Sequence, residues 1–489
     1  MSETAESNTD RIDAYVWRIS LVVILGSIMS ILDTTIVNVA LDTLGRELHS
    51  SIADIQWVVT GYLLSLAAVI PVSGWAARRF GAKNVYLLSL VLFTAGSALC
   101  GLATTTTELV AFRVLQGIGG GMILPVSQLI MAEAAGPKRM GRVMSLVAVP
   151  AMLAPILGPT IGGLILENTT WRWIFYVNLP IGIIAVIAAL RILPKVESKV
   201  TEPLDVVGLL LMAAGLPLIT YGLAEIGTTG SFTSGKVVIP LIGGLLLVAA
   251  FARHALRVPR PLLNLRLYKR RTFSSASIAM FFVAAALFGG MILLPYYWQS
   301  LRHESVVVTG LLLAPQGLGA ALMMPLAGKL TDRYGGGGLT LFGVSLVALA
   351  TVPFGLIGAH TSIVLLCAAM VVRGFGIGFA FMPAMSAAFA SLERSELSDA
   401  TPQLNVLQRV GGSIGTAVLA VVLQRSLAGA HTLSAAASAY GTAFWAAAAM
   451  AALAIVPAIV LMRAEREARR ARAAASEPDE QAMAEPVAA

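Results

Sequence analysis

Long apolar runs recur along the whole chain and constrain its fold more than any other feature. Runs of about 18 to 25 residues, each long enough to cross a bilayer as a helix, follow one another from Val16 to Met462. They are too many and too regular for a single anchor or a buried core. Of the 489 residues, 57% are apolar and only 12% are charged, which excludes a soluble globular protein. The sequence therefore predicts an all-α polytopic membrane protein.

Fourteen membrane-spanning helices are predicted when each crossing is given about twenty apolar residues. They lie near 18–40, 55–77, 84–103, 108–131, 141–166, 173–192, 205–225, 237–257, 273–297, 306–331, 339–358, 362–388, 403–425 and 439–462. An even number places both ends of the chain on one side of the membrane. No small-residue cleavage site follows the first apolar run, so we expect this run to be kept as a span.

The distribution of basic residues predicts the orientation of the spans. With the amino terminus inside, most of the 34 Lys and Arg fall in cytoplasmic segments, including the cluster from Arg253 through Arg271. Both termini are therefore predicted to be cytoplasmic. The net charge of +8 is interpreted as topology and not as affinity for nucleic acid. The Ala/Arg/Glu-rich tail from Arg463 is expected to be a short solvated helix that frays into disorder, with anionic headgroups nearby.

The two ends of the chain resemble each other at a nearly constant offset. Residues 74–81 match 328–335, residues 158–162 match 411–415, and Arg113 matches Arg373. The repeat pairs spans one to six with spans nine to fourteen in the same orientation, as in carriers that work by alternating access. The predicted divisions are a cytoplasmic segment 1–17, a six-helix bundle 18–192, a linker with two inserted helices 193–272, a second six-helix bundle 273–462, and a cytoplasmic tail 463–489.

Several motifs together resemble the 14-span drug:proton antiporter branch of the major facilitator superfamily. They are LDTTIVNVAL (32–41), QWVVTGYLL (56–64), RVLQGIGGG (113–121), ILGPTIGG (156–163) and WRWIFYVNLPIG (171–182). The resemblance covers the region from Leu32 to about Gly415 and implies a major-facilitator-type fold. It also implies proton-coupled export of amphipathic compounds, because the motif in span five marks antiporters.

Two sets of residues are expected to serve conformational change. Gly158, Pro159, Gly162 and Gly163 in span five combine a missing helix donor with small residues, which favours a bend and a packing seam. The loops after spans two and ten resemble the family's Gly-x-x-x-Asp-Arg-x-Gly gating loop, and the second copy keeps Asp332, Arg333 and Gly335. The first copy carries Arg78 where an acidic residue is common. This departure puts charge pairing at the first loop in doubt, and ordinary positive-inside topology is the alternative explanation for Arg78. Gly81 and Gly335 are expected in tight turns.

Asp33 is the only carboxylate predicted to lie deep inside an apolar span. An ionisable group there costs roughly 2.5–3.5 kcal/mol to insert, so it is expected to face a cavity, find a partner or bind a proton. Counting at about 1.5 Å per residue places Asp33 and Arg113 at similar depths below the outer boundary, so they can meet. We expect Asp33 to exchange protons and Arg113 to tune it; a purely structural ion pair is the alternative.

The other polar and aromatic side chains of the spans are candidates for substrate binding. They are Asn38, Trp57, Tyr62, Gln116, Gln316, Arg373 and Met382. Arg373 has no acidic residue inside any span of its own half, so carbonyls, Gln316, Gln408, water, Asp33 or an anionic substrate are its possible partners. Three arginines and one aspartate in the spans favour neutral or acidic amphiphiles over dications, although the resemblance favours cationic compounds.

The sequence predicts that the protein uses no metal ion, no cofactor and no ATP. Two cysteines and five scattered histidines predict no metal site, no cofactor is expected, and no Walker motif is present, so ion gradients are the expected energy source. The expected partners are small amphipathic substrates, protons and the lipid bilayer, with the chain a monomer in a bacterial cytoplasmic membrane. The alternatives are an exporter of one endogenous metabolite, antibiotic or lipid, and an uptake symporter on the same fold. A membrane enzyme is the weakest alternative.

Overall fold

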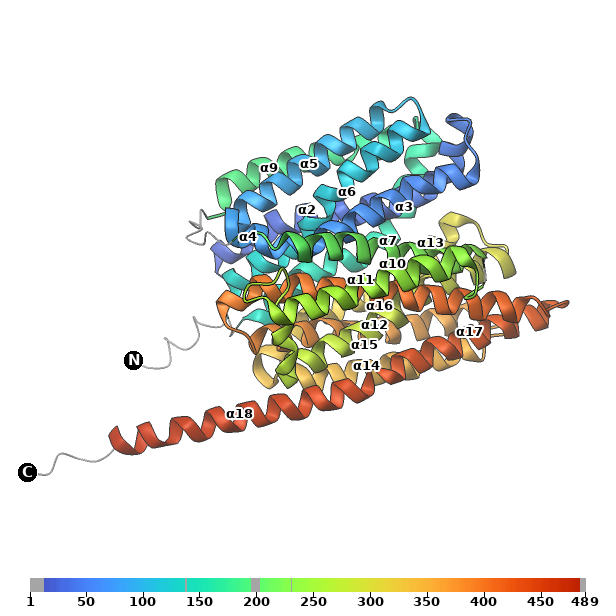
Figure 1. Ribbon diagram of the computed structural model, residues 1–489. Helices are drawn as coiled ribbons and strands as arrows, with labels where there is room; N and C mark the ends of the chain where they lie inside the picture. Colours follow the sequence, from blue (N-terminus) through green and yellow to red (C-terminus); the bar gives the residue numbers. More distant parts are fainter. Residues whose placement is uncertain (1–12, 137–138, 195–202, 230, 484–489) are drawn as a thin grey trace, which may run out of the picture.

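The structure is a bundle of long helices. The computed structural model describes residues 13–136, 139–194, 203–229 and 231–483, and every regular element in these ranges is helical (Figure 1). The all-α membrane fold predicted from the sequence is therefore confirmed. Two predicted segments are only partly described. Residues 1–12 of the segment 1–17 and residues 195–202 of the linker lie outside the described residues.

Within the described residues, thirteen helical stretches are long and apolar enough to span a membrane. The helices of eight or more residues are α2 (Ala14–Glu47), α3 (Ile52–Val69), α4 (Ser73–Phe80), α5 (Ala82–Leu102), α6 (Thr106–Ala135), α7 (Met140–Asn168), α9 (Asn178–Ile192), α10 (Val206–Thr229), α11 (Gly235–Arg257), α12 (Arg271–Tyr296), α13 (Val306–Tyr334), α14 (Gly336–Gly355), α15 (Ile363–Ala390), α16 (Leu397–Leu427), α17 (Leu433–Leu453) and α18 (Ile455–Met483). Helix α7, of 29 residues, occupies the position of the predicted fifth span. A total of fourteen spans stays a prediction.

Side-chain caps begin the helices that start at the end of the bundle predicted to be extracellular. The hydroxyls of Ser51, Thr105, Ser305 and Thr432 accept hydrogen bonds from backbone N–H groups in the first turns of α3, α6, α13 and α17. Such caps satisfy donors that a helix cannot pair internally. Backbone groups near lipid have no water to bind, so these polar residues fit the place where each span begins.

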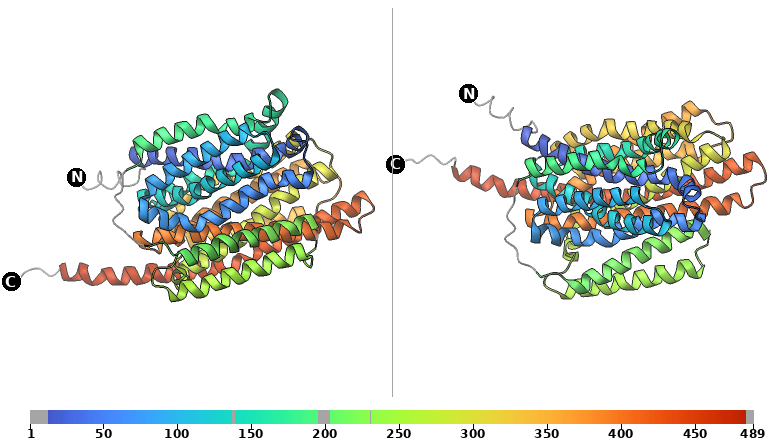
Figure 2. Two further views of the ribbon diagram at one scale, coloured as in Figure 1. Left: turned by 45° about the horizontal axis from the view of Figure 1, so that its top comes forward. Right: turned by 90° about the horizontal axis from the view of Figure 1, so that it is seen from above.

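The helices form two groups that touch each other, and an inserted hairpin packs along one side of both (Figures 1 and 2). In the first helix group, α2 packs against α6, α7 and α9, and α6 also packs against α3 and α5. In the second helix group, α12 packs against α16, and α15 packs against α13 and α14. The two groups meet where α7 runs along α13 and where α4 crosses α16, and the hairpin helix α10 contacts both α3 and α16. The exact domain boundaries stay predictions.

The carboxyl-terminal tail is longer and better anchored than the sequence suggested. Helix α18 runs without interruption from Ile455 to Met483 and projects beyond the bundle (Figure 1). Both Glu465 carboxylate oxygens accept hydrogen bonds from the first amides of α14, at 3.0 Å from Gly336 N and 2.6 Å from Gly337 N. The helix predicted from Arg463 is therefore present, but it continues to Met483 and Glu465 holds its start against α14, so it is neither short nor fully solvated; residues 484–489 lie outside the described residues.

Candidate functional site

Asp33 lies inside the first helix group and contacts Arg113. The similar depths inferred from the sequence for these two residues allowed this contact. Asp33 Oδ2 is 2.5 Å from Arg113 Nη1, and both side chains are fully buried. Helix α2 carries the aspartate and α6 carries the arginine, so the pair joins two helices of the same group. Arg113 Nη1 is the donor of this hydrogen bond, and the Asp33 carboxylate accepts it.

Amide side chains complete the surroundings of the Asp33 carboxylate. Asp33 Oδ1 accepts hydrogen bonds from Gln116 Nε2 at 3.0 Å and from Asn178 Nδ2 at 2.9 Å. Gln116 Oε1 in turn accepts from Arg113 Nη1 at 2.8 Å, and Asn178 donates a second hydrogen bond to Ser97 Oγ at 3.1 Å. Every neighbour bonded to the carboxylate is a donor, which suits an ionised acid and offers no acceptor for an added proton.

Asn178 is the member of this site that we did not single out from the sequence. It is the first residue of α9 and is buried, although it lies within the WRWIFYVNLPIG motif that contributed to the family resemblance. A lone asparagine in an apolar span was a usable signal, because a buried amide needs hydrogen-bond partners. Its proximity to Asp33, far away in the sequence, was not predictable.

Tyr62 belongs to this buried site and not to an exposed binding surface. The guanidinium carbon of Arg113 lies 4.1 Å from the centroid of the Tyr62 ring, in cation–π geometry, and Tyr62 is fully buried. Arg113 Nε also donates to the Val58 carbonyl at 3.2 Å. In this structure Tyr62 and Gln116 contact the Asp33–Arg113 pair, and their predicted role in substrate binding stays untested.

Arg373 occupies the corresponding place in the second helix group without an acidic partner. Its Nη1 donates to Gln316 Oε1 at 2.8 Å and its Nη2 to the Ala286 carbonyl at 3.0 Å, whereas Nε has no hydrogen-bond partner among the described residues. Arg373 is 1% exposed. A Cβ on Gly290 would overlap Nη2, so this glycine makes room for the guanidinium. Of the predicted partners, Gln316 and a carbonyl are the ones present.

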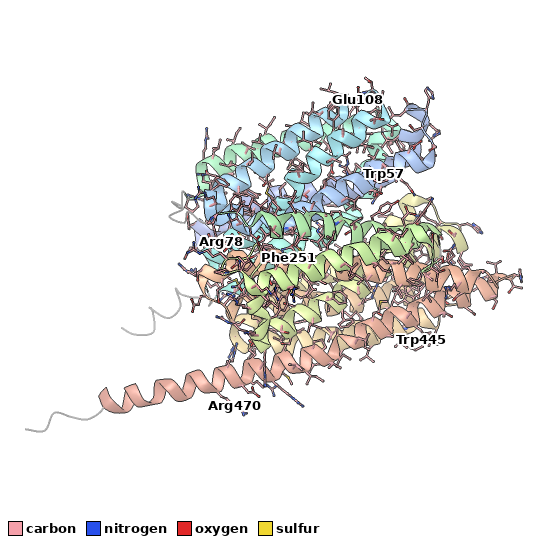
Figure 3. The ribbon with its side chains drawn as sticks, viewed as in Figure 1. Trp57, Arg78, Glu108, Phe251, Trp445 and Arg470 are labelled. Atoms are coloured by element: carbon pink, nitrogen blue, oxygen red, sulfur yellow. The ribbon has the colours of Figure 1, made fainter. Side chains whose placement is uncertain are left out.

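The remaining predicted binding residues do not converge on one surface in this structure. Met382 lies on α15, is 2% exposed and packs in the hydrophobic core of the bundle. Trp57, labelled in Figure 3, is 43% exposed. Its ring stacks on that of Tyr221 in the inserted hairpin, with ring centroids 5.9 Å apart. Asn38 is exposed on α2. The hairpin therefore covers one face of Trp57.

The first gating loop does form a charge pair, with its polarity reversed relative to the second. Arg78 Nη1 binds Asp399 and donates to Ser398 Oγ at 3.1 Å, which joins α4 to α16. In the second loop, Asp332 Oδ2 binds Arg142 Nε at 2.8 Å, which joins α13 to α7. Asp399 and Arg142 were not identified from the sequence. Both pairs connect the two helix groups.

Other residues of the gating loops follow their predicted geometry only in part. Gly81 and Gly335 adopt positive φ angles of 84° and 93° at the turns that follow α4 and α13, as expected for tight turns. Arg333 is exposed, and its guanidinium lies 5.2 Å from the ring centroid of neighbouring Tyr334. No contact of Arg333 between the two groups is found in the described part of the chain. Its predicted conformational role stays untested.

Two glycines of span five allow α7 to pack closely against α2 within the first helix group. A Cβ on Gly158 would overlap Thr35 Oγ1, and one on Gly162 would lie 3.3 Å from Ile36, so α7 approaches α2 closely there. Gly163 faces open space, because a Cβ at this position would have no neighbour within 4 Å. The side chain of Pro159 lies outside the described residues. Close packing at Gly158 and Gly162 is present, and the pivot function stays a prediction.

The chain is similar to transport proteins over most of its length. The family model for the Major Facilitator Superfamily matches residues 23–416. The multidrug resistance protein B homolog of Mycobacterium tuberculosis is 40% identical over 420 residues, which cover 85% of this chain and 78% of that protein. The multidrug export protein EmrB of Haemophilus influenzae is 29% identical over 427 residues, covering 85% and 82%.

A solved structure shares the same fold. The proton:xylose symporter XylE matches with a TM-score of 0.62 and 17% sequence identity, over 91% of this chain and 95% of that chain. The helix arrangement, the repeat and the family model agree with the motifs found in the sequence. The chain belongs to the major facilitator superfamily.

Proposed function

We propose that this protein exports amphipathic small molecules in exchange for protons by alternating access. The observation that carries the proposal is the fully buried Asp33 carboxylate, held by Arg113 and by two amide donors. Placing an ionisable acid deep in a span costs free energy, so such a residue is expected to have a partner or a function. Here Asp33 has a partner, Arg113, and the hydrogen bond between them can break and form again. The names of the Mycobacterium tuberculosis and Haemophilus influenzae relatives support drug export.

The proton would bind when the Asp33–Arg113 contact opens. In the present arrangement, Asp33 is 0% exposed and bonded only to donors, so water does not reach it. Movement of α6 relative to α2 would release one carboxylate oxygen from Arg113 and admit water. The freed oxygen could then take a proton from that water. The proton is then carried when the helices return.

The cross-group ion pairs close one end of the bundle in this structure. Arg78–Asp399 and Asp332–Arg142 lie at the end of the bundle from which α18 projects, which the basic residues predict to be cytoplasmic (Figure 3 labels Arg78). With both pairs formed, the two groups are held together at that end. We infer that access to the transport path from the cytoplasm requires both pairs to separate.

The substrates we propose are neutral or acidic amphiphiles at least as much as dications. The fully buried charges in the described spans are the Asp33–Arg113 pair and Arg373, which has only neutral hydrogen-bond partners there, whereas Arg409, the third arginine of the spans, is partly exposed on α16. An uncompensated cation in a medium of low dielectric constant repels a second cation and attracts an anion. A transport panel that covers neutral, anionic, monocationic and dicationic compounds tests this.

The coupling is tested in proteoliposomes with an imposed pH gradient. Asp33→Asn keeps the size of the side chain but removes the titrating group, so we expect proton-driven transport to fall to background while the protein still folds. Asp42→Asn is the matched control, because Asp42 lies on the same helix and is exposed at 84% in its side chain. Its transport should equal that of the wild type. Proton-driven transport by Asp33→Asn at the wild-type rate would exclude Asp33 from coupling.

The direction of transport is tested with everted membrane vesicles. An exporter accumulates substrate inside everted vesicles when they are acidified internally, whereas an uptake symporter releases it under the same gradient. The span-five motif and the names of the relatives favour accumulation. Release would identify the alternative, a proton-coupled symporter on the same fold.

A further inference from the structure

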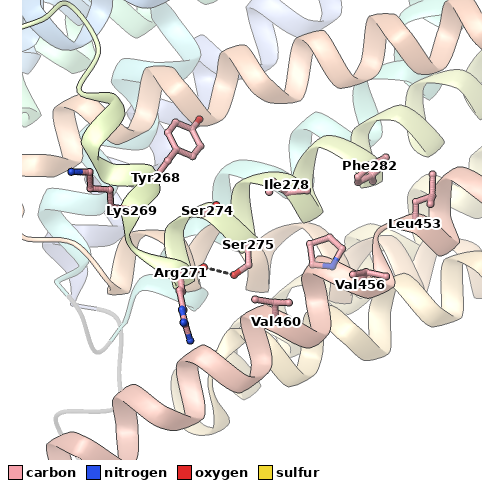
Figure 4. A pocket seen from close by; sticks show the side chains of 11 residues that line it. Tyr268, Lys269, Arg271, Ser274, Ser275, Ile278, Phe282, Leu453, Val456 and Val460 are labelled. Atoms are coloured by element: carbon pink, nitrogen blue, oxygen red, sulfur yellow. Dashed lines mark hydrogen bonds between the residues drawn. The ribbon is translucent and has the colours of Figure 1, made fainter. Parts of the chain in front are cut away.

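A groove on the outside of the second helix group combines a basic end with an apolar length. It has a volume of about 620 Å³ and lies between α12 and α18 (Figure 4). The polar end is lined by Tyr268, Lys269, Arg271 and Ser274. The apolar part is lined by Ile278, Phe282, Leu453, Val456, Pro457 and Val460. None of these residues belongs to the Asp33 site or to the cross-group pairs.

The two cations at the polar end are not used by the protein itself. Lys269 and Arg271 are exposed, and neither forms an ion pair with any described residue. Arg270 lies between them in sequence but points away, where its guanidinium binds Glu396 at 2.8 Å and the Ser391 carbonyl at 2.6 Å. One arginine of this run therefore has a structural partner, whereas the two flanking residues line the polar end of the groove, with their charged head groups pointing outward in different directions (Figure 4).

The dimensions of the groove match one leaflet of a bilayer. Eleven residues separate Arg271 from Phe282 on α12, which corresponds to about 16 Å of helix. This is about half of a hydrocarbon core of roughly 30 Å. The groove opens on the surface that a membrane surrounds, since α12 and the first part of α18 belong to the candidate spans Arg271–Leu301 and Leu433–Arg470. A cationic end at the interface and an apolar end toward the midplane are thus separated as in a phospholipid.

We propose that this groove binds one anionic phospholipid, with its phosphate at Lys269 and Arg271 and one acyl chain along Ile278, Phe282 and Val456. Basic residues next to a span attract anionic headgroups at roughly 1 kcal/mol per cation. The phosphate also meets Ser274, whose hydroxyl can donate a hydrogen bond. The lipid fills the space between α12 and α18 and holds the tail helix against the bundle.

Native mass spectrometry of the full-length protein in detergent tests the proposal. The probes are phosphatidylglycerol and phosphatidylcholine of the same acyl composition, added at equal concentration. The wild type should retain one phosphatidylglycerol at collision energies that remove phosphatidylcholine. The variant Lys269→Gln/Arg271→Gln should bind phosphatidylglycerol about 30-fold more weakly, which corresponds to the loss of two cations at roughly 1 kcal/mol each.

The matched control removes two cations from the same basic loop outside the groove. Arg253 and Arg257 are exposed near the end of α11 and do not line it. Arg253→Gln/Arg257→Gln should keep the wild-type affinity. An equal loss in both double variants would show unspecific surface charge and would overturn the proposal. A second variant, Val460→Trp, fills the apolar part and should lower retention while both cations are present; unchanged retention would exclude the groove as the site.

Discussion

Arg78 in the first gating loop binds Asp399 of the opposite helix group, and Asp332, at the matching position of the second loop, binds Arg142. The sequence repeat aligns Arg78 with Asp332, so the same place in the two copies carries opposite charges. Each partner has the complementary sign. The unusual Arg78 is therefore part of a cross-group contact, and the doubt about charge pairing at the first loop is resolved by Asp399.

Exchanging the two charges tests this contact. Arg78→Asp and Asp399→Arg should each lower the transport rate severalfold, because each places two like charges together at the closed end. The combined variant should recover much of the rate, with a coupling of about 0.5–2 kcal/mol for two residues in direct contact. Initial rates of substrate transport in vesicles, corrected for protein amount, measure the effect.

An exposed pair on the same protein serves as the control. Arg46 and Asp42 form an ion pair in which the side chains are 73% and 84% exposed. Exchanging these two charges should leave transport unchanged, since exposed pairs contribute little. Failure of the combined Arg78→Asp/Asp399→Arg variant to exceed either single variant would exclude a direct functional contact.

A methyl group at Gly158 should destabilise the protein. Its Cβ would overlap Thr35 Oγ1 on α2, so Gly158→Ala forces α7 away and is expected to cost about 1–3 kcal/mol. Gly163→Ala in the same helix meets nothing within 4 Å and should be neutral or stabilising by up to about 1 kcal/mol. Thermal unfolding in detergent compares the two. Equal melting temperatures would contradict the close packing of α2 and α7.

Removing the buried cation of the second group should change which substrates are preferred. Arg373→Gln deletes a charge that has only neutral partners among the described residues. A cation about 10 Å away gains roughly 1.7 kcal/mol at an effective dielectric constant of about 20, so its kcat/KM should rise roughly 17-fold relative to a neutral compound, while that of an anion should fall by about the same factor. Arg425→Gln, which removes an exposed cation, is the control. An unchanged ratio of cation to anion transport would show that Arg373 does not act on substrate charge.

Asp205 should make the inserted hairpin sensitive to acid. Burial alone would raise the pKa of Asp205, but hydrogen bonds from Gly208 N–H, His254 and Leu262 N–H outweigh it and lower that pKa. A lowered pKa in the folded state contributes stability that is present above about pH 4 and is lost as the pH falls further. Asp205→Asn should therefore be about 1–3 kcal/mol less stable than the wild type at pH 7.

The difference should shrink as the pH is lowered. Melting temperatures of wild type and Asp205→Asn, measured in detergent between about pH 3 and pH 7, provide the test. The two curves should approach each other below about pH 4, where the wild-type carboxylate is protonated in the unfolded chain and then in the folded protein. A constant gap across the range would show that the carboxylate's charge does not stabilise the hairpin.

The sequence predicted distances along helices better than the directions in which their side chains point. The contact of Asp33 with Arg113 followed from counting residues, because the rise of a helix is fixed. The inward orientation of Tyr62 and Met382 did not follow, since apolar residues surround each span and give no periodicity that marks its buried face. The hairpin's position over Trp57 was likewise not encoded in any local pattern.

Contacts between distant helices were the other part that sequence reasoning missed. Asn178, Asp399 and Arg142 are ordinary polar residues in the chain, and only the packing of separate helices gives them partners. The repeat predicted that the two gating loops are related. It did not reveal which residue each loop meets, because those partners lie in α16 and α7, outside the repeated motif.

Because the two gating loops carry opposite charges, both cross-group pairs have the same polarity from one helix group to the other. Arg78 and Arg142 both belong to the first group, whereas Asp399 and Asp332 both belong to the second. In these two pairs, closing that end brings the two cations of the first group against the two carboxylates of the second group. Opening separates these opposite charges. Mobile salt screens such partly exposed charges over about 8 Å at physiological ionic strength. The balance between closed and open forms is thereby linked to the salt content of the solution bathing that end.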